Sequence, residues 1–174
     1  MDEQELVEVL RALDGELTSA SDVVFVGGAA MILHFGARRA TRDVDVLPLQ
    51  GDIGELRRAV KTIARQHALP EDWMSDAVKG FVDILPPGFS SRLVRLDLSL
   101  EHLRLYVPGR PEQVAMEVVA LRERDLEDLE LLLPTLTEAD KGIIAGIVEH
   151  VGTFRPDWAQ KMRYFLLEQG WQIQ

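Results

Sequence analysis

The order of hydrophobic and polar positions divides the first part of the chain into a helix and a buried strand. Between residues 3 and 13, four apolar residues lie three or four positions apart with acidic residues among them, which predicts an amphipathic helix. Residues 23–26 read Val-Val-Phe-Val. Four consecutive apolar residues, three of them β-branched, are typical of a strand that is buried on both faces.

A pair of glycines and a second strand follow this run. Gly27 and Gly28 interrupt the apolar sequence, and residues 29–33 are short and wholly apolar, which predicts a buried helix. Residues 43–46 then alternate aspartate and valine, a period of two that predicts a strand. The pattern over residues 23–46 is therefore strand, glycine turn, helix and acidic strand.

The middle of the chain predicts two further helices and a strand. Residues 54–68 have the spacing of an amphipathic helix. Pro70 and the two acids after it favour the start of another helix, which we expect to carry Trp73 and to end near Gly80. Residues 81–85 predict a short strand before a Pro-Pro-Gly turn.

The remainder of the chain changes from strands to helices. Residues 92–99 alternate strictly, which predicts a strand with Arg95, Asp97 and Ser99 on one face, and residues 103–107 predict another strand. Apolar spacing then predicts four helices, over residues 112–122, 125–133, 137–151 and 156–169.

This order of elements predicts an α/β (α+β) fold, in which a small mixed β-sheet is flanked by helices and followed by C-terminal helices. A chain of 174 residues suits one compact domain, and no flexible linker interrupts it. We therefore expect a single domain over residues 1–174, with its core at about residues 20–110 and a helical C-terminal part at about residues 111–174.

Composition narrows the class of protein. Hydrophobic residues make up 47% of the chain and charged residues 28%, which suits a folded globular protein rather than a disordered one. The chain has no cysteine, which excludes a disulfide framework and a thiolate site. No apolar run approaches the length of a membrane span, and the acidic first segment is unlike a signal peptide. We expect a cytoplasmic protein without a membrane partner.

The formal net charge of -10 bears on the partners. This charge repels a nucleic-acid backbone, so a nucleic acid would need a local basic patch, for instance Arg38, Arg39 and Arg42. Small anionic substrates that are accompanied by a divalent cation fit the balance better. Charge alone does not decide between the two.

The two aspartates and the two glycines are suited to phosphate chemistry. Residues two apart on a strand point to the same side, so Asp43 and Asp45 can bracket divalent cations, with Mg²⁺ as the natural occupant and Mn²⁺ as a substitute. Gly27 and Gly28 lack Cβ atoms, which lets phosphate oxygens approach the backbone amides in front of a helix. The stretch therefore predicts a site for a metal and a triphosphate.

Each part of this stretch also has a plainer interpretation. An isolated Gly-Gly pair is most often a turn, and a lone Asp-x-Asp on a strand is often an edge that faces solvent. The combination is harder to explain structurally, because clustered carboxylates beside a buried strand are costly without a cation. The combination therefore favours the chemical interpretation.

The order of strand, Gly27-Gly28, helix and Arg-x-Thr-x-Asp-x-Asp at residues 39–45 resembles the signature of the polymerase-β-like nucleotidyltransferase superfamily. The chain is most similar to its minimal bacterial branch, which includes toxin-type enzymes of abortive-infection and toxin–antitoxin systems. Residues 69–80, 103–107 and 124–129 are similar to an uncharacterised family of that branch. The resemblance covers about residues 20–133 and implies a nucleotidyltransferase type of sheet.

The resemblance implies a metal site built from carboxylates. Asp43 and Asp45 would be ligands of Mg²⁺ and catalytic residues. Enzymes of the superfamily often add a third carboxylate from a neighbouring strand, and Asp97 matches this role by its position and alternation. The alternative for Asp97 is an ordinary surface residue of a strand.

The resemblance also implies a nucleotide-binding role for four residues. Gly27 and Gly28 would hold the phosphates, while Arg39 and Thr41 would contact phosphate or orient Asp43. For Thr41 the alternative is that it only favours the strand conformation.

One position departs from the family pattern. The helix before the Arg-Asp motif tends to carry lysine in an Ala-Met-Lys run, whereas residues 115–117 of this chain read Ala-Met-Glu. Glu117 thus replaces a cation that would neutralise developing phosphate charge. Asp125 matches the motif and is a further candidate site residue, with a helix N-cap as its alternative role. Lys79 is a further candidate site residue, and Lys79, Arg122 or Arg124 would compensate for the missing lysine.

Pattern and resemblance together favour a Mg-dependent nucleotidyltransferase that transfers a nucleoside monophosphate from a nucleoside triphosphate to an acceptor hydroxyl. The acceptor would be a tRNA end or a protein side chain, and a cognate toxin or antitoxin would be a further partner. One alternative is a catalytically degenerate fold that binds nucleotides or proteins, which the acid at Glu117 favours. The other is a purely structural α/β domain, in which the Gly-Gly pair and the Asp-x-Asp motif would face different sides.

Overall fold

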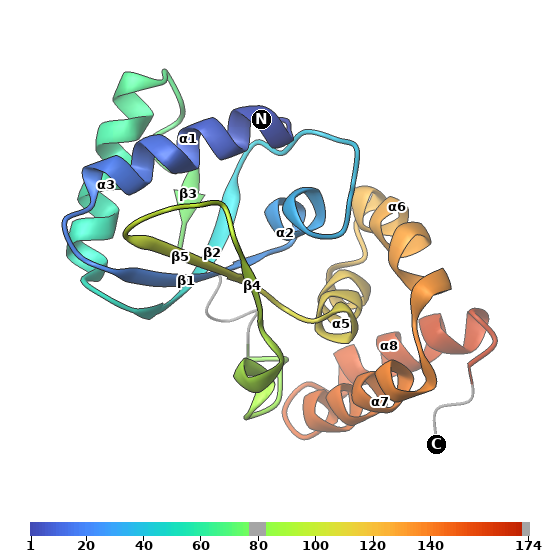
Figure 1. Cartoon of the computed structure of the whole chain (residues 1–174). Helices are drawn as coiled ribbons and strands as arrows, with labels where there is room; N and C mark the ends of the chain where they lie inside the picture. The colour runs from blue at the N-terminus through green and yellow to red at the C-terminus, as the bar shows by residue number, and fades with distance from the viewer. Residues whose placement is uncertain (77–82, 172–174) are drawn as a thin grey trace. The chain divides into compact units, whose positions relative to one another are not determined.

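The computed structural model describes residues 1–76 and 83–171 (Figure 1). Of these, residues 1–76 and 93–107 form one compact unit, which contains the β-sheet, and residues 83–92 and 108–171 form a second, helical unit. The fold is thus a mixed α/β structure with a mixed sheet, flanking helices and C-terminal helices. The predicted fold class is confirmed.

Five strands form the sheet of the first unit in the order β3-β2-β1-β5-β4. Central β1 (Ser21–Val26) runs antiparallel to β2 (Val44–Gln50) and parallel to β5 (Leu103–Val107). Outside these, β3 (Met74–Ser75) pairs parallel with β2, and β4 (Val94–Leu96) pairs antiparallel with β5. Because β1 has a neighbour on each side and helices around it, its four consecutive apolar residues are all buried, as their pattern predicted.

The described residues of the first unit also form the helices α1 (Glu3–Glu16), α2 (Gly28–Leu33) and α3 (Ile53–Gln66). The long helices α1 and α3 begin at aspartate N-caps, Asp2 and Asp52, whose carboxylates accept backbone N–H groups of the first turn. They pack against each other (Figure 1), and Glu55 of α3 accepts hydrogen bonds from Thr18 and Ser19, just beyond α1. Each of these two helices has a buried apolar face, which includes Leu10 of α1 and Ile63 of α3.

The second unit is helical, and its described elements are η1 (Phe89–Arg92), α5 (Arg110–Ala120), α6 (Glu123–Leu132), η2 (Leu133–Thr135), α7 (Glu138–Gly152) and α8 (Pro156–Glu168). Nearly every residue of α5 is buried, because α5 packs against α6, α7 and α8 (Figure 1). The four predicted C-terminal helices are confirmed. Within the described part of the chain, every helix is too short or too polar to cross a membrane.

The helix predicted from Pro70 onward is wrong for the described residues 70–76. A turn leads into the two-residue strand β3, where the carbonyl of Trp73 accepts a hydrogen bond from Val44 at 2.7 Å. The buried indole of Trp73 also donates to the carbonyl of Val60 at 3.1 Å. These long-range bonds outweigh the local preference for a helix. The rest of that predicted helix, residues 77–80, lies outside the described residues.

Two predicted strands also need correction. Residues 83–85 form a turn, and the apolar Ile84 and Leu85 are buried by packing rather than by strand pairing; residues 81–82 lie outside the described part. The strand predicted over residues 92–99 is limited to β4. It ends at Leu96 because Asp97 accepts a hydrogen bond from the backbone of Ser99 at 3.1 Å, which closes a turn.

Candidate functional site

The glycine turn between β1 and α2 has a backbone conformation that requires Gly27. Gly27 has φ of 57° and ψ of -136° and is the N-cap of α2. A side chain is rarely accommodated at this φ, although the space around a Cβ atom here is open to at least 4 Å. The need for glycine at this position is therefore conformational and not steric.

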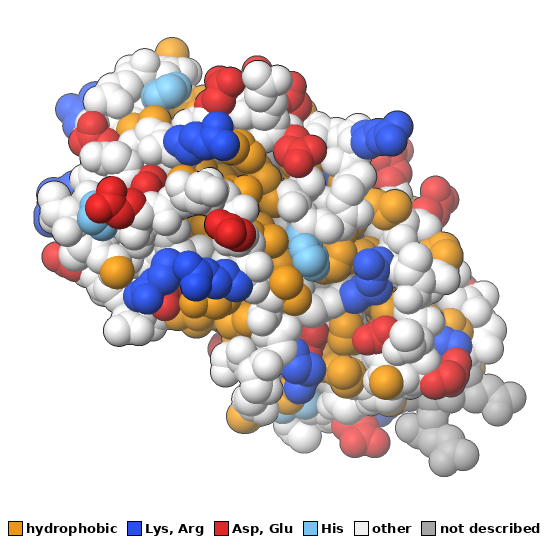
Figure 2. All heavy atoms as spheres, in the orientation of Figure 1, with side chains coloured by type: hydrophobic (Ala, Val, Ile, Leu, Met, Phe, Trp, Pro, Cys, Tyr) orange, Lys and Arg blue, Asp and Glu red, His pale blue; other side chains and the backbone are white. Residues whose placement is uncertain are grey.

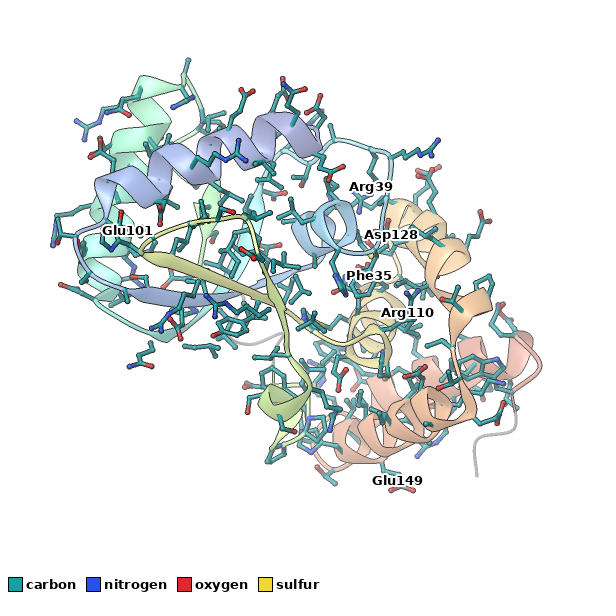
Figure 3. The ribbon with its side chains drawn as sticks, in the orientation of Figure 1. Phe35, Arg39, Glu101, Arg110, Asp128 and Glu149 are labelled. Carbon is teal, nitrogen blue, oxygen red and sulfur yellow. The ribbon has the colours of Figure 1, made fainter. Side chains whose placement is uncertain are left out.

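At Gly28 the constraint is different and consists of close approach by neighbouring side chains. A Cβ atom on Gly28 would lie 3.1 Å from Oγ1 of Thr41 and 3.5 Å from Nη1 of Arg39. The structure thus brings three of the predicted nucleotide-binding residues together on the loop side of α2. Figure 3 labels Arg39 on the loop between α2 and β2. A cationic guanidinium and a hydroxyl beside a glycine turn are suited to contact with phosphate oxygens.

The loop that carries Thr41 is held by hydrogen bonds on both sides. The side chain of Thr41 is buried, and its Oγ1 donates to the carbonyl of Asp43 at 2.8 Å. Its backbone N–H donates to the carbonyl of Met1 at 2.8 Å, and the amino group of Met1 donates to the carbonyl of Thr41. Thr41 therefore fixes the backbone at Asp43 while its hydroxyl remains close to Gly28.

The two aspartates of the motif lie where the glycine turn begins. Asp45 pairs with Val26 across β1 and β2, and Val26 is the residue before Gly27. Asp43 directly precedes β2 and is exposed, and Asp45 is partly exposed, whereas Val44 and Val46 between and after them are buried. The alternation predicted from the sequence is thus present, with carboxylates toward solvent and valines in the core.

Asp97 is not brought to this place. It follows β4, and strands β5 and β1 lie between β4 and β2 in the sheet. Three strand spacings amount to roughly 14 Å, which is too far for a ligand of the same metal ion as Asp45. The carboxylate of Asp97 accepts a backbone hydrogen bond in its own turn instead.

The residue beside Asp45 on the other side is Ser75, which sequence reasoning missed. β3 pairs parallel with β2, and its register matches Asp45 with Ser75. Residues matched in this way point to the same face of a sheet. A two-residue strand carries no periodicity, so the sequence offered no signal for it. The candidate Lys79 lies outside the described residues.

A groove of about 820 Å³ adjoins this site within the first unit. It runs along the first turns of α1 and the loop after α2, and Arg39 belongs both to its wall and to the surroundings of Gly28. The charged residues of the groove are acidic Asp2, Glu3 and Glu8 and basic Arg11, Arg38 and Arg39. The groove therefore offers charges of both signs to a molecule that binds next to the glycine turn.

A second group of acids lies in the helical unit, between α5 and α6. Glu117 of α5 and Asp125 and Asp128 of α6 are all buried, and oxygen atoms of the three carboxyl groups lie within 4.8 Å of one another. Asp125 is the third residue of α6 rather than its N-cap, and it accepts a hydrogen bond from the backbone of Arg122 at 2.7 Å. The N-cap role considered for Asp125 is therefore wrong, because Arg122 is the N-cap and Asp125 accepts the hydrogen bond as the third residue of the helix.

The side chain of Glu117 is unusual for a carboxyl group. Burial, together with the negative charges of Asp125 and Asp128, raises the pKa of Glu117 to about 8, although the amide of Gln113 donates a hydrogen bond to it at 2.6 Å. The signal in the sequence was an acid within the apolar run of α5, and the two aspartates at a spacing of three on α6 complete the group.

The comparison with known families agrees with this geometry. The sequence profile of a family described as "nucleotidyltransferase of unknown function (DUF6036)" matches residues 4–141. The match includes the whole sheet, the glycine turn and both helices of the acidic group. The chain therefore belongs to this nucleotidyltransferase family, as its signature predicted. No curated protein matches the chain.

Proposed function

We propose that this member of the nucleotidyltransferase family binds a nucleoside triphosphate with Mg²⁺ at the turn between β1 and α2 and transfers the nucleoside monophosphate to an acceptor hydroxyl. The observation that carries the proposal is the pairing of Asp45 with Val26, which puts a carboxylate next to Gly27. In the transfer, the acceptor hydroxyl loses its proton to solvent, its oxygen forms a bond to the α-phosphorus, and the bond from that phosphorus to the leaving pyrophosphate breaks.

The phosphates would be bound by the turn and its loop. The absence of a side chain at Gly28 leaves backbone amides accessible, and Arg39 supplies a fixed positive charge a few ångströms away. Helix α2 has only six residues, so its dipole contributes little. The affinity for phosphate would therefore depend mainly on Arg39 and the amides.

Asp43 and Asp45 would hold the metal ion. Carboxylate oxygens are the ligands that Mg²⁺ prefers, and Mn²⁺ accepts the same donors. When bound, the ion supplies charge neutralisation for the triphosphate. The chain's own contribution is to keep the two carboxylates in place: Thr41 holds the backbone of Asp43 through its hydroxyl, and the pairing with β1 holds Asp45. Ser75 is the polar neighbour of Asp45 in this arrangement.

For the acceptor we favour a protein side chain over a tRNA end. The net charge of -10 disfavours a polyanion, and Asp2, Glu3 and Glu8 line the groove next to the site. On the face in Figure 2, the basic side chains stand in small separate groups with acidic and polar groups between them. A cognate protein of a toxin–antitoxin pair is an acceptor of this class.

A second candidate function is nucleotide binding without transfer. The specific observation in its favour is the place of Asp97, because the described strands next to Asp45 bring a serine and not a third carboxylate. Binding of a triphosphate would then persist while turnover is absent.

Transfer assays separate the two functions. The protein is incubated with Mg²⁺ and each of the four ribonucleoside triphosphates, labelled at the α-phosphate, together with bulk tRNA in one arm and cellular protein in another. We expect label in the protein fraction with the wild type and none with Asp45→Asn. Label in tRNA would reverse the choice of acceptor. Binding of triphosphate with no transfer in either arm would establish the second function.

A further inference from the structure

The three buried acids between α5 and α6 pose an electrostatic problem that the proposed transfer does not use. Glu117, Asp125 and Asp128 are 3%, 1% and 2% exposed, and their oxygens lie within 4.8 Å of one another. Figure 3 labels Asp128 on α6. Three negative charges at this separation, away from water, repel strongly, so a proton or a cation must balance them.

The hydrogen bonds distinguish Glu117 from its neighbour Asp125. Asp125 accepts from the backbone N–H and from Nε of Arg122, at 2.7 Å and 3.1 Å, and Nε of Arg124 lies 3.8 Å from its other oxygen. These donors stabilise its ionised form. Glu117 instead accepts from a neutral amide, that of Gln113. Protonation therefore costs less free energy at Glu117 than at Asp125, because Glu117 has no charged hydrogen-bond donor that its neutral form would lose.

We propose that Glu117 is protonated at neutral pH and donates its proton in a hydrogen bond to the carboxylates of α6, so that α5 and α6 are joined by a proton-dependent contact. This inference is independent of the proposed function, because it concerns the helical unit alone. A carboxylic acid thus joins two helices by a bond that a carboxylate cannot make.

The other charged groups around α5 do not change this assignment. From α8, Lys161 donates a hydrogen bond to the carbonyl of Val119 at 2.9 Å, so its charge lies at the C-terminal end of α5. From η1, Arg92 pairs with Glu112, which lies five positions before Glu117. The buried residues of α7 are apolar. In the described part of the helical unit, the charges that raise the pKa of Glu117 are those of Asp125 and Asp128 on α6.

The pH dependence has a definite sign. The pKa of Glu117 is raised from 4.5 to about 8, first by burial and then by Asp125 and Asp128. In the unfolded chain the group loses its proton near its ordinary pKa, whereas in the folded chain it retains the proton up to about 8. Its contribution to stability is therefore complete below about pH 4.5 and is lost progressively as the pH rises to about 8.

The test compares melting temperatures of the wild type and Glu117→Gln between about pH 5 and pH 9. The amide of glutamine can donate the same hydrogen bond and does not titrate. We expect the melting temperature of the variant to rise relative to the wild type with increasing pH and the difference to level off above about pH 8. Glu127→Gln, an exposed acid of α6, is the matched control and should show no such trend.

A second measurement does not depend on the variant's folding. Carbon-13 NMR of the wild type, with the glutamate carboxyl carbons labelled, should show one buried glutamate that titrates near pH 8. The proposal would be overturned by a difference in melting temperature between wild type and Glu117→Gln that stays constant from about pH 5 to pH 9. It would also be overturned by a carbon-13 shift showing that the Glu117 carboxyl group is already ionised at pH 7. Mg²⁺ or Mn²⁺ that stabilises Asp45→Asn but not Glu117→Gln would overturn it as well, because it would show a cation in place of the proton.

Discussion

Asp45 lies directly opposite Val26 in the antiparallel pair of β1 and β2, one residue before the Gly27–Gly28 turn. Opposed residues of such a pair have Cα atoms about 4.5–5.5 Å apart. Asp45 and Val26 are 19 positions apart in the sequence, yet the acidic strand and the glycine turn are parts of one surface. The proposed Mg²⁺–triphosphate site follows from this pairing.

Replacement of Gly27 by alanine should destabilise the protein through the backbone alone. The φ of 57° at Gly27 disfavours any side chain, although a Cβ atom would meet nothing within 4 Å. We expect Gly27→Ala to lower the free energy of unfolding by about 1–3 kcal/mol in a urea titration. Gly142→Ala is the control, since Gly142 lies in α7 with open space and no positive φ. That change should be neutral or stabilising by up to about 1 kcal/mol. Equal effects of the two changes would contradict the account of the turn.

Removal of the Thr41 hydroxyl should weaken both stability and nucleotide binding. In Thr41→Val the shape of the buried side chain is retained, but the 2.8 Å hydrogen bond to the carbonyl of Asp43 is lost. We expect the free energy of unfolding to fall by about 0.5–1.5 kcal/mol. The affinity for triphosphate should fall as well, because Asp43 is no longer held. A stability loss with unchanged affinity would show that Thr41 has no role in the site.

Asp14 should make the protein sensitive to acid. Its carboxylate accepts the backbone N–H groups of Glu101, His102 and Leu103 at 2.7–2.9 Å, which ties α1 to the start of β5. Burial raises the pKa of Asp14, but the three hydrogen bonds together lower it by a larger amount, so the net pKa is below 3.8. A lowered pKa gives stability that is present above about pH 4 and is lost as the pH falls through the folded-state pKa.

The measurement for Asp14 is thermal unfolding as a function of pH. At neutral pH we expect Asp14→Asn to lower the free energy of unfolding by about 1–2 kcal/mol, because the amide cannot accept all three hydrogen bonds. The gap between wild type and variant should narrow as the pH falls below about 4, where Asp14 itself becomes protonated. A difference in stability between wild type and Asp14→Asn that stays constant down to pH 2 would show that Asp14 is not the cause of the acid sensitivity.

The indole hydrogen bond of Trp73 should be important for the edge of the sheet. Trp73→Phe removes the donor to the carbonyl of Val60 and leaves that carbonyl buried without it. We expect Trp73→Phe to lower the free energy of unfolding by about 1–3 kcal/mol in a denaturant titration. Trp158→Phe, a half-buried tryptophan of α8 against Arg155, should cost less. The opposite order would mean that the hydrogen bond from Trp73 to α3 is not a main support of this edge.

The sequence predicted those elements whose signal is local. The long helices have apolar residues at helical spacing, and the buried run at residues 23–26 specified the central strand. The two residues of β3 have no period of their own, and their pairing depends on Val44 and Trp73, which are far apart in the chain. Pro70 and its acids therefore predicted a helix where tertiary hydrogen bonds produce a turn and a strand.

The arrangement of the candidate residues was predictable in part for the same reason. Gly27, Gly28, Arg39, Thr41 and the two aspartates fall within one supersecondary unit, in which Gly28 lies beside Arg39 and Thr41, and Asp45 pairs with the residue before Gly27. The order of strands in a sheet cannot be predicted from the local sequence pattern. For this reason Asp97 was expected beside Asp45, and Ser75 was not expected there. The group around Glu117 depends on how α5 packs on α6, which the sequence showed only as an acid in an apolar run.

The most direct test of the central claim is a calorimetric titration of the wild type, Asp45→Asn and Asp97→Asn with ATP and GTP, with and without Mg²⁺. The account predicts Mg²⁺-dependent binding by the wild type, at least a tenfold loss of affinity in Asp45→Asn, about 1.4 kcal/mol, and no change in Asp97→Asn. Wild-type protein that binds neither nucleotide with Mg²⁺, or Asp45→Asn that binds as tightly as the wild type, would contradict it.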